Sequence, residues 1–157
     1  MSFQLRSAAF ADGQPVPRRH TGDGEDLSPP LSWTGLPSGA ASLALIVDDP
    51  DAPSSEPWVH WVIYNLPADE QGLVEGIPPS DRPASPSGAV QGENSWGTVG
   101  YRGPAPPRGH GVHHYIFRLF ALNQGVNLPR GLDKPSLLAA IRGHVIAEAT
   151  LTGTYQR

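Results

Sequence analysis

Glycine and proline interrupt this chain so often that it cannot consist mainly of long helices. The sequence has 18 glycines and 18 prolines among 157 residues, and many of them lie between five short apolar stretches. Glycine and proline are typical of turns, whereas short apolar stretches bounded by them are typical of β-strands. The pattern therefore predicts β-strands joined by long loops.

Three of the apolar stretches are the clearest candidates for strands. Residues 43–47 are continuously apolar, which predicts a buried strand, and an acidic, proline-rich stretch follows directly at 48–53. Residues 58–66 carry aromatic and β-branched side chains on both faces, which favours a central strand. Residues 112–122 predict the longest strand. The intervening residues 68–111 are expected to be mostly loop, and a loop of this length in a compact domain is usually functional.

The period of the apolar pattern changes in the last part of the chain. Apolar residues there recur at every fourth position: Leu137, Ile141 and Val145. This spacing predicts a helix, for which Asp133 is a suitable N-cap and Pro135 fits the first turn. A last strand is expected at 151–155.

The composition excludes several classes of protein. With 11 lysines and arginines against 15 aspartates and glutamates, the formal net charge is −4, which argues against a nucleic-acid partner. The absence of cysteine excludes disulfides, thiolate metal sites and a cysteine nucleophile. No stretch approaches the ~20 apolar residues of a transmembrane segment, and the first residues lack the apolar core of a secretory signal. We therefore expect one cytoplasmic domain over residues 1–157.

Polar side chains lie near the ends of the predicted strands. Alternate residues of a strand share a face, so His113 and Tyr115 are expected side by side. Asp49 and Asp51 follow the strand at 43–47 and are held in place by the prolines around them. If the strands are neighbours, these groups converge at one edge of a sheet.

A second histidine, His60, lies within the predicted central strand. By strict alternation it shares a face with Trp58, Val62 and Tyr64, so the imidazole projects among aromatic neighbours. Taken alone, such a residue is more often a hydrogen-bonded core histidine than a functional one.

Histidine and tyrosine donors that converge in a partly dry pocket suit a small oxyanion, such as a phosphate monoester or a carboxylate. Carboxylates beside them would accept an imidazole N–H and favour the charged ring, which then faces the anion. A metal is a weaker alternative for His110, His113 and His114, because the last two point to opposite faces of a strand. We therefore expect no metal and no cofactor.

Four motifs stand in order along the chain: DLSPPLSW at 26–33, DDPDAP at 48–53, VHW at 59–61, and GYRGPAPP at 100–107 followed by GVHHY at 111–115. Together they resemble the phosphatidylethanolamine-binding protein family, and more narrowly its prokaryotic branch, the Raf kinase inhibitor-like proteins. The resemblance extends over nearly the whole chain.

The resemblance implies a mainly β fold: an antiparallel Greek-key β-sandwich with one C-terminal helix and long loops. It also implies a small anion pocket, to which the following residues correspond by motif position: Asp49, Asp51, Trp58, His60, Gly103, Pro107, His113 and Tyr115. Members of the family bind phosphate-like anions and phospholipid head groups, eukaryotic relatives inhibit kinases or proteases, and prokaryotic relatives often form homodimers.

Three functional hypotheses follow. The first is a non-catalytic binding protein for a phosphate-like anion or lipid head group, which regulates a kinase or protease. The second is a hydrolase or isomerase that uses an Asp-His pair as general base. The third is an interaction protein whose exposed loops bind a partner kinase or protease.

Overall fold

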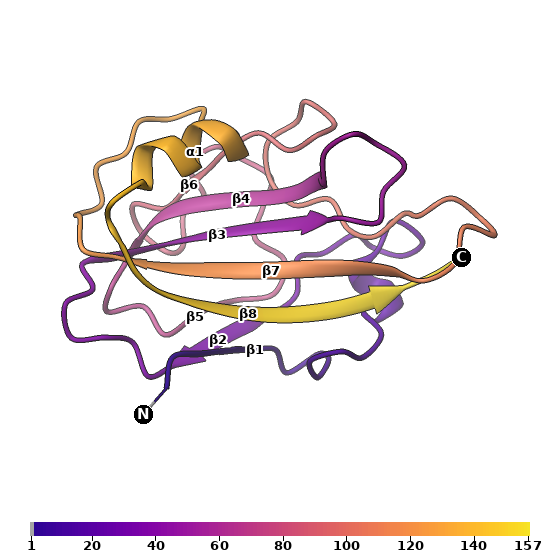
Figure 1. Cartoon of the computed structure of the whole chain (residues 1–157), viewed down its shortest axis with the longest axis horizontal. Coiled ribbons are helices and arrows are strands. Elements are labelled where there is room, and N and C mark those ends of the chain that lie inside the picture. Colours follow the sequence, from indigo (N-terminus) through magenta and orange to yellow (C-terminus); the bar gives the residue numbers. More distant parts are fainter. Residues whose placement is uncertain (1) are drawn as a thin grey trace.

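The computed structural model describes residues 2–157, which form two antiparallel sheets and one α-helix (Figure 1). The larger sheet has the strand order β6-β4-β3-β7-β8, and the smaller one the order β1-β2-β5. The strands of the larger sheet are β3 (Ser42–Asp49), β4 (Trp58–Pro67), β6 (Val90–Gln91), β7 (His113–Leu122) and β8 (Val145–Tyr155). The remaining elements are β1 (Gln4–Arg6), β2 (Leu31–Thr34), β5 (Gly72–Leu73), the short 3₁₀ helix η1 (Arg18–His20) and α1 (Lys134–Ile141).

The mainly β sandwich predicted from the sequence is confirmed. After the β3–β4 hairpin, the long connection returns the chain to the other side of β3, so β7 pairs with β3 and not with β4. This return is the Greek-key feature of the fold. Within residues 2–157, no helix is long and apolar enough to cross a membrane.

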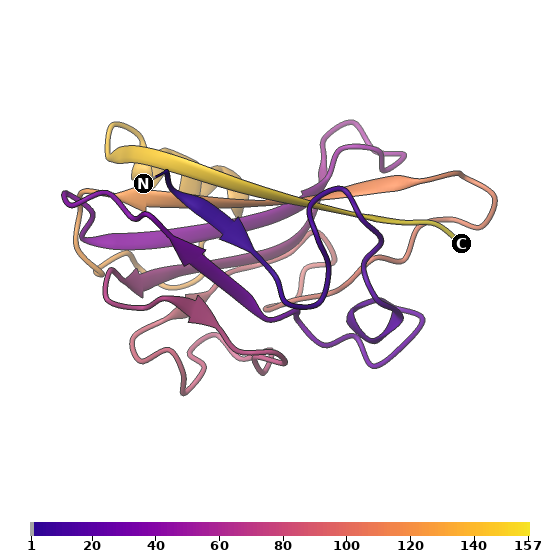
Figure 2. The same cartoon turned by 90° about the horizontal axis from the view of Figure 1, so that it is seen from below.

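The larger sheet is covered on both faces, which explains the continuous apolar run of β3. The smaller sheet and α1 lie on its opposite sides (Figure 2). One face packs against the smaller sheet through a cluster that includes Leu43, Leu45 and Phe117. The other face packs under α1 through a cluster that includes Ala44 and Ile46. Every residue of β3 is therefore buried, as expected of a strand with no solvent-facing side.

A β-bulge in β4 changes the direction in which His60 points. Val47 pairs with Trp61 and Asp48 pairs with Val59, so His60 is an extra residue without a partner on β3. A bulge interrupts the strict alternation of side chains and is often found next to functional sites. The prediction that His60 shares a face with Val62 and Tyr64 is therefore wrong, because those two residues pack under α1.

The predicted helix is confirmed at its beginning and is too long at its end. Asp133 is the N-cap, and its Oδ1 accepts a hydrogen bond from the backbone N–H of Ser136 at 3.0 Å. The helix ends at Ile141, two residues before Gly143, which has a φ of +81°. Val145 continues the four-residue spacing only by coincidence, because it begins β8 and is 42% exposed.

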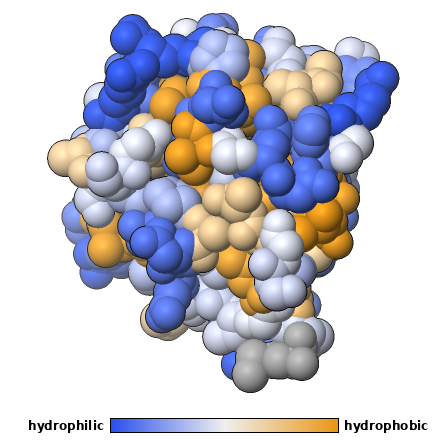
Figure 3. Space-filling model, turned by 90° about the vertical axis from the view of Figure 1, so that its left-hand side faces the viewer, coloured by the Kyte–Doolittle hydropathy of each residue, from blue (hydrophilic) through white to orange (hydrophobic). Residues whose placement is uncertain are grey.

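The end of the molecule at which β3 begins shows apolar residues interspersed with polar ones (Figure 3). The opposite end, where β3 stops, carries the polar groups that the sequence singled out. Single exposed apolar residues are normal on a protein surface. The C-terminal end of β3 is therefore the candidate location of a functional site.

Candidate functional site

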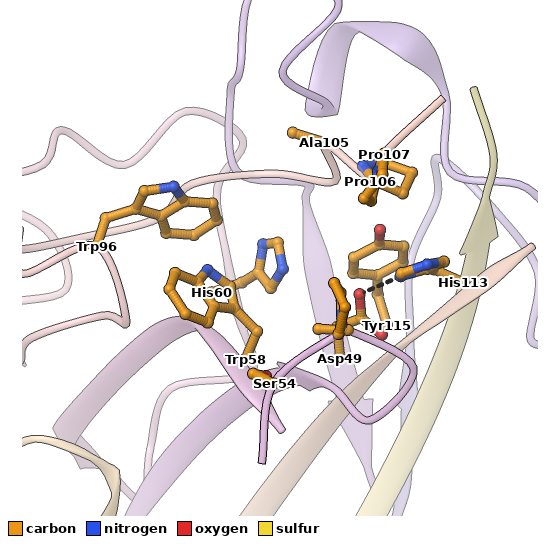
Figure 4. A pocket seen from close by; sticks show the side chains of 12 residues that line it. Asp49, Ser54, Trp58, His60, Trp96, Ala105, Pro106, Pro107, His113 and Tyr115 are labelled. Atoms are coloured by element: carbon orange, nitrogen blue, oxygen red, sulfur yellow. Dashed lines mark hydrogen bonds and ion pairs between the residues drawn. The ribbon is translucent and has the colours of Figure 1, made fainter. Parts of the chain in front are cut away.

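A pocket of about 260 Å³ opens where β3 and β4 meet the start of β7 (Figure 4). Its lining comes from these strand ends and from the loops at 52–54, 96 and 105–107. The residues that line it are Asp49, Ala52, Pro53, Ser54, Trp58, His60, Trp96, Ala105, Pro106, Pro107, His113 and Tyr115. This volume suits a small ligand or a head group rather than a drug-sized molecule.

Asp49 and His113 form a buried pair across β3 and β7. Oδ2 of Asp49 lies 2.6 Å from Nδ1 of His113, and the two residues are only 3% and 1% exposed. Because a carboxylate accepts, Nδ1 of His113 carries the hydrogen, which fixes the orientation of the ring. The other carboxylate oxygen, Oδ1, accepts the backbone N–H of Asp51 at 2.8 Å and so holds the following loop. His113, which the sequence predicted at the edge of a sheet, is therefore a buried residue.

His110 extends this pair to the protein surface. Its Nδ1 lies 2.6 Å from Nε2 of His113, and its side chain is exposed. A chain of carboxylate, buried imidazole and exposed imidazole thus leads from Asp49 to solvent. The sequence had suggested His110 only as a metal ligand. Among residues 2–157, no three histidine, cysteine or acidic side chains gather as a metal site.

His60 is held by a backbone carbonyl and not by a carboxylate. Its Nδ1 lies 2.6 Å from the carbonyl oxygen of Arg102, and the residue is 3% exposed. The ring stands edge-on between two aromatic rings, with centroids 4.9 Å from Trp96 and 5.1 Å from Tyr115. Since a carbonyl oxygen can only accept, Nδ1 of His60 carries a hydrogen.

Burial lowers the pKa of His60, and the bond to the Arg102 carbonyl and the nearby carboxylates oppose this shift only in part. The ring is therefore neutral near pH 7, with a bare lone pair on Nε2. This differs from the expectation that neighbouring acids hold both imidazoles in the charged form.

Tyr115 supplies a neutral hydroxyl to the same pocket. Burial, followed by the Asp49 carboxylate, raises the pKa of Tyr115, so the phenol keeps its hydrogen throughout the physiological range. Trp58 and Trp96 form an aromatic wall, with their rings edge-to-face at 5.5 Å. The guanidinium of Arg102 lies 4.7 Å from the centre of the Trp96 ring. The pocket thus combines few polar groups with a largely apolar wall.

Two of the residues expected at the pocket lie elsewhere. Asp51 accepts hydrogen bonds from the backbone N–H and from Nδ1 of His114, each at 2.8 Å, on an exposed surface beside the pocket. Burial acts to raise the pKa of Asp51, but the two bonds from His114 more than offset it, so this pKa is lowered. Asp51 therefore orients a histidine outside the pocket.

Gly103, the second of these, has a structural place. Its backbone N–H donates to Oδ1 of Asp26 at 2.7 Å, and a Cβ at this position would lie 2.1 Å from the carbonyl oxygen of His20. Only a glycine allows the loop at 103 to approach η1 this closely. The other six expected residues line the pocket: Asp49, Trp58, His60, Pro107, His113 and Tyr115.

Trp96 is the main pocket residue that the sequence did not reveal. It reaches the pocket from a tight loop in which Oδ1 of Asn94 accepts the backbone N–H groups of Trp96 and Thr98 at 3.0 and 3.2 Å. An asparagine two residues before a tryptophan in a long loop carries no periodic signal. The asparagine-centred turn itself was the one available clue.

Comparison with known proteins agrees with the fold and the motifs. The sequence profile of the family described as phosphatidylethanolamine-binding protein matches residues 6–156. A UPF0098 protein of Methanothermobacter thermautotrophicus is 54% identical over 155 residues, which cover 99% of each chain. The crystal structure of E. coli YbcL has a TM-score of 0.92 at 34% identity and covers 100% of this chain and 99% of its own.

The Chlamydia trachomatis homologue CT736 has a TM-score of 0.88 at 41% identity, covering 99% of this chain and 98% of its own. The profile match and these relatives each span almost the entire chain. The chain therefore belongs to the phosphatidylethanolamine-binding protein family, in its prokaryotic branch.

Proposed function

We propose that this chain is a non-catalytic binding protein whose pocket holds a small phosphate-like anion, either free or as part of a head group. The observation that carries the proposal is the buried pair of Asp49 and His113, which lines one small pocket together with Tyr115. Buried polar groups of this kind are costly to maintain unless they are satisfied. Asp49 and His113 satisfy each other, and a ligand with oxygen acceptors would offer a partner to the Tyr115 hydroxyl beside them.

The arrangement has suitable donors for an anion. His113 can donate from Nε2 when it carries hydrogens on both ring nitrogens and His110 turns aside, and Tyr115 can donate from its hydroxyl. Asp49 then balances the positive charge of the imidazolium from the far side of the ring. Hydrogen bonds to a charged ligand are strong in such a partly dry site. Because this mode needs the imidazolium, affinity is expected to fall as pH rises.

Calorimetric titration with phenyl phosphate tests the proposal, at about pH 5.5 and pH 8 so as to bracket the usual range of histidine titration. Tyr115→Phe removes one donor while keeping the ring, and is expected to weaken binding about tenfold. The matched control is His114→Ala, which removes the neighbouring exposed histidine and should leave affinity unchanged. No binding at either pH, or an equal loss in both variants, would contradict the proposal.

The general-base alternative keeps some support, because a carboxylate that orients a buried histidine is also an enzymatic arrangement. The one hydroxyl of the loop that lines the pocket, Ser54, donates instead to the carbonyl of Glu56 at 2.6 Å. A screen of esters and phosphoesters with Asp49→Asn as control tests this alternative. Turnover that disappears in the variant would favour an enzyme.

The wider biological setting remains a prediction. Regulation of a kinase or protease, pairing as a homodimer, a cytoplasmic location and a single domain over residues 1–157 all rest on the sequence and on the family. Pull-down with the wild type and with Tyr115→Phe would show whether any partner depends on the pocket.

A further inference from the structure

The pocket contains a hydrogen-bond acceptor that has no partner among residues 2–157. His60 uses Nδ1 to donate to the carbonyl of Arg102, and in the part of the chain that the structure describes its Nε2 makes no hydrogen bond. The residue is only 3% exposed, and its ring lies between Trp96 and Tyr115 at the pocket wall (Figure 4). A bound ligand would thus meet a lone pair at this point.

The charges around His60 determine whether Nε2 stays an acceptor. Asp49 at the end of β3, its neighbour Asp48 and Asp26 in the loop after η1 favour the charged ring, whereas burial disfavours it more strongly. Tyr115 on β7 is neutral. The Arg102 guanidinium lies over the ring of Trp96, one of the two aromatic residues beside His60. Because the net result is a lowered pKa of His60, the neutral tautomer with hydrogen on Nδ1 persists near pH 7.

A fully deprotonated oxyanion has only acceptors, so its oxygen would face the lone pair of Nε2 without a hydrogen between them. We propose that His60 makes the pocket selective for an oxyanion that still carries a hydroxyl hydrogen, such as a phosphate monoester monoanion, over phosphodiesters and sulfate esters. The P–OH group donates to Nε2, while the remaining oxygens accept from Tyr115 and His113.

This inference rests on the proposed function and narrows its ligand class. The head group of a diacyl phospholipid is a phosphodiester and has no such hydrogen, whereas a terminal phosphate monoester has one. The pocket is therefore expected to prefer the monoester, whether it is free or attached to a lipid.

Phenyl phosphate and phenyl sulfate are a matched pair for the test. At about pH 5, below the second pKa of a phosphate monoester at about 6, each ester has a single negative charge and nearly the same shape. They differ in the hydroxyl hydrogen, which only the phosphate has. We expect calorimetry to give phenyl phosphate an affinity about ten- to a hundredfold higher than phenyl sulfate, and methyl phenyl phosphate to resemble the sulfate.

The variant His60→Gln places an amide near Nε2 that can donate or accept, so the preference should shrink to within about threefold. His114→Gln is the control and should keep the full preference. Long-range ¹H–¹⁵N spectra of the wild type at the pH of the ester comparison add a test that needs no variant, because the proposal requires Nε2 of His60 to show the signal of an unprotonated ring nitrogen there.

The outcomes separate the two proposals. Equal affinity for the phosphate and the sulfate in the wild type, or a protonated Nε2 in the free protein, would overturn the selectivity and leave the anion pocket standing. Binding of neither ester would overturn the anion pocket and the selectivity together.

Discussion

Replacing Asp49 by alanine should destabilise the fold far more than replacing Asp51, although both aspartates bond a histidine of the same strand. Asp49→Ala leaves the Nδ1–H of His113 without an acceptor at a residue that is 1% exposed, and removes the acceptor for the backbone N–H of Asp51. Breaking a buried pair by removing one partner costs about 3–5 kcal/mol.

The second pair provides the control. His114 and Asp51 lie 2.8 Å apart, but their side chains are 51% and 41% exposed. Water can replace either partner, so an exposed pair of this kind contributes about 0–1 kcal/mol. Each substitution removes a carboxylate that links the end of β3 or the loop after it to the start of β7. The two carboxylates differ mainly in how deeply they are buried.

Urea unfolding followed by tryptophan fluorescence measures both losses as free energies of unfolding, with the slope against urea checked for constancy. In thermal unfolding, the loss in Asp49→Ala corresponds to a melting temperature lower by roughly 6–20 °C. The double variant Asp49→Ala/His113→Ala should recover part of the loss, because the orphaned imidazole is gone. A loss for Asp49→Ala no larger than that for Asp51→Ala would refute the reasoning from burial.

Three further predictions concern the rest of the fold. Asp133→Ala should lower the free energy of unfolding in urea by about 1 kcal/mol, because it removes the N-cap bond to Ser136. An unchanged free energy would mean that this bond does not stabilise the helix. Gly103→Ala should lower the free energy of unfolding by about 1–3 kcal/mol, because the new Cβ meets the His20 carbonyl. A variant as stable as the wild type would contradict this, and its crystal structure would show how the loop moves. The lowered pKa of His60 means that the unfolded chain takes up a proton before the native state does, so this residue destabilises the fold as pH falls below about 6.5. Stability of His60→Gln, measured against pH, should lack this part of the acid loss, and parallel curves for the two proteins would contradict it.

The sequence predicted those parts of the fold that depend on local pattern. The apolar run before Asp49 gave β3, the alternation from His113 gave the buried face of β7, and Asp133 marked the start of α1. Each of these signals is contained within a few neighbouring residues. The helix end was misplaced because Val145 lies four residues after Ile141, as a helical residue would. The helix has already ended there, and Val145 begins β8.

The candidate site depends more on pairing across the sheet, which a local pattern does not contain. The direction of His60 follows from a bulge that exists only in the register with β3. The links from His110 to His113 and from His114 to Asp51 depend on which loop reaches which strand end. The alternation of a strand did predict that His113 and His114 point to opposite faces. The structure places His113 in the buried pair with Asp49 and His114 in the exposed pair with Asp51.

The central claim is that one small pocket binds a phosphate-like anion through His113, Tyr115 and His60. Its most direct test is a titration of the ¹⁵N-labelled protein with phenyl phosphate at about pH 5.5, where the monoester still carries its hydrogen, followed through the ring nitrogens of the histidines. The account predicts that the signals of His60 and His113 shift and saturate together. The signals of His114 and of His144, an exposed residue that bonds the Asn123 side chain, should stay in place. Saturating shifts at His114 or His144, with His60 and His113 unchanged, would contradict it.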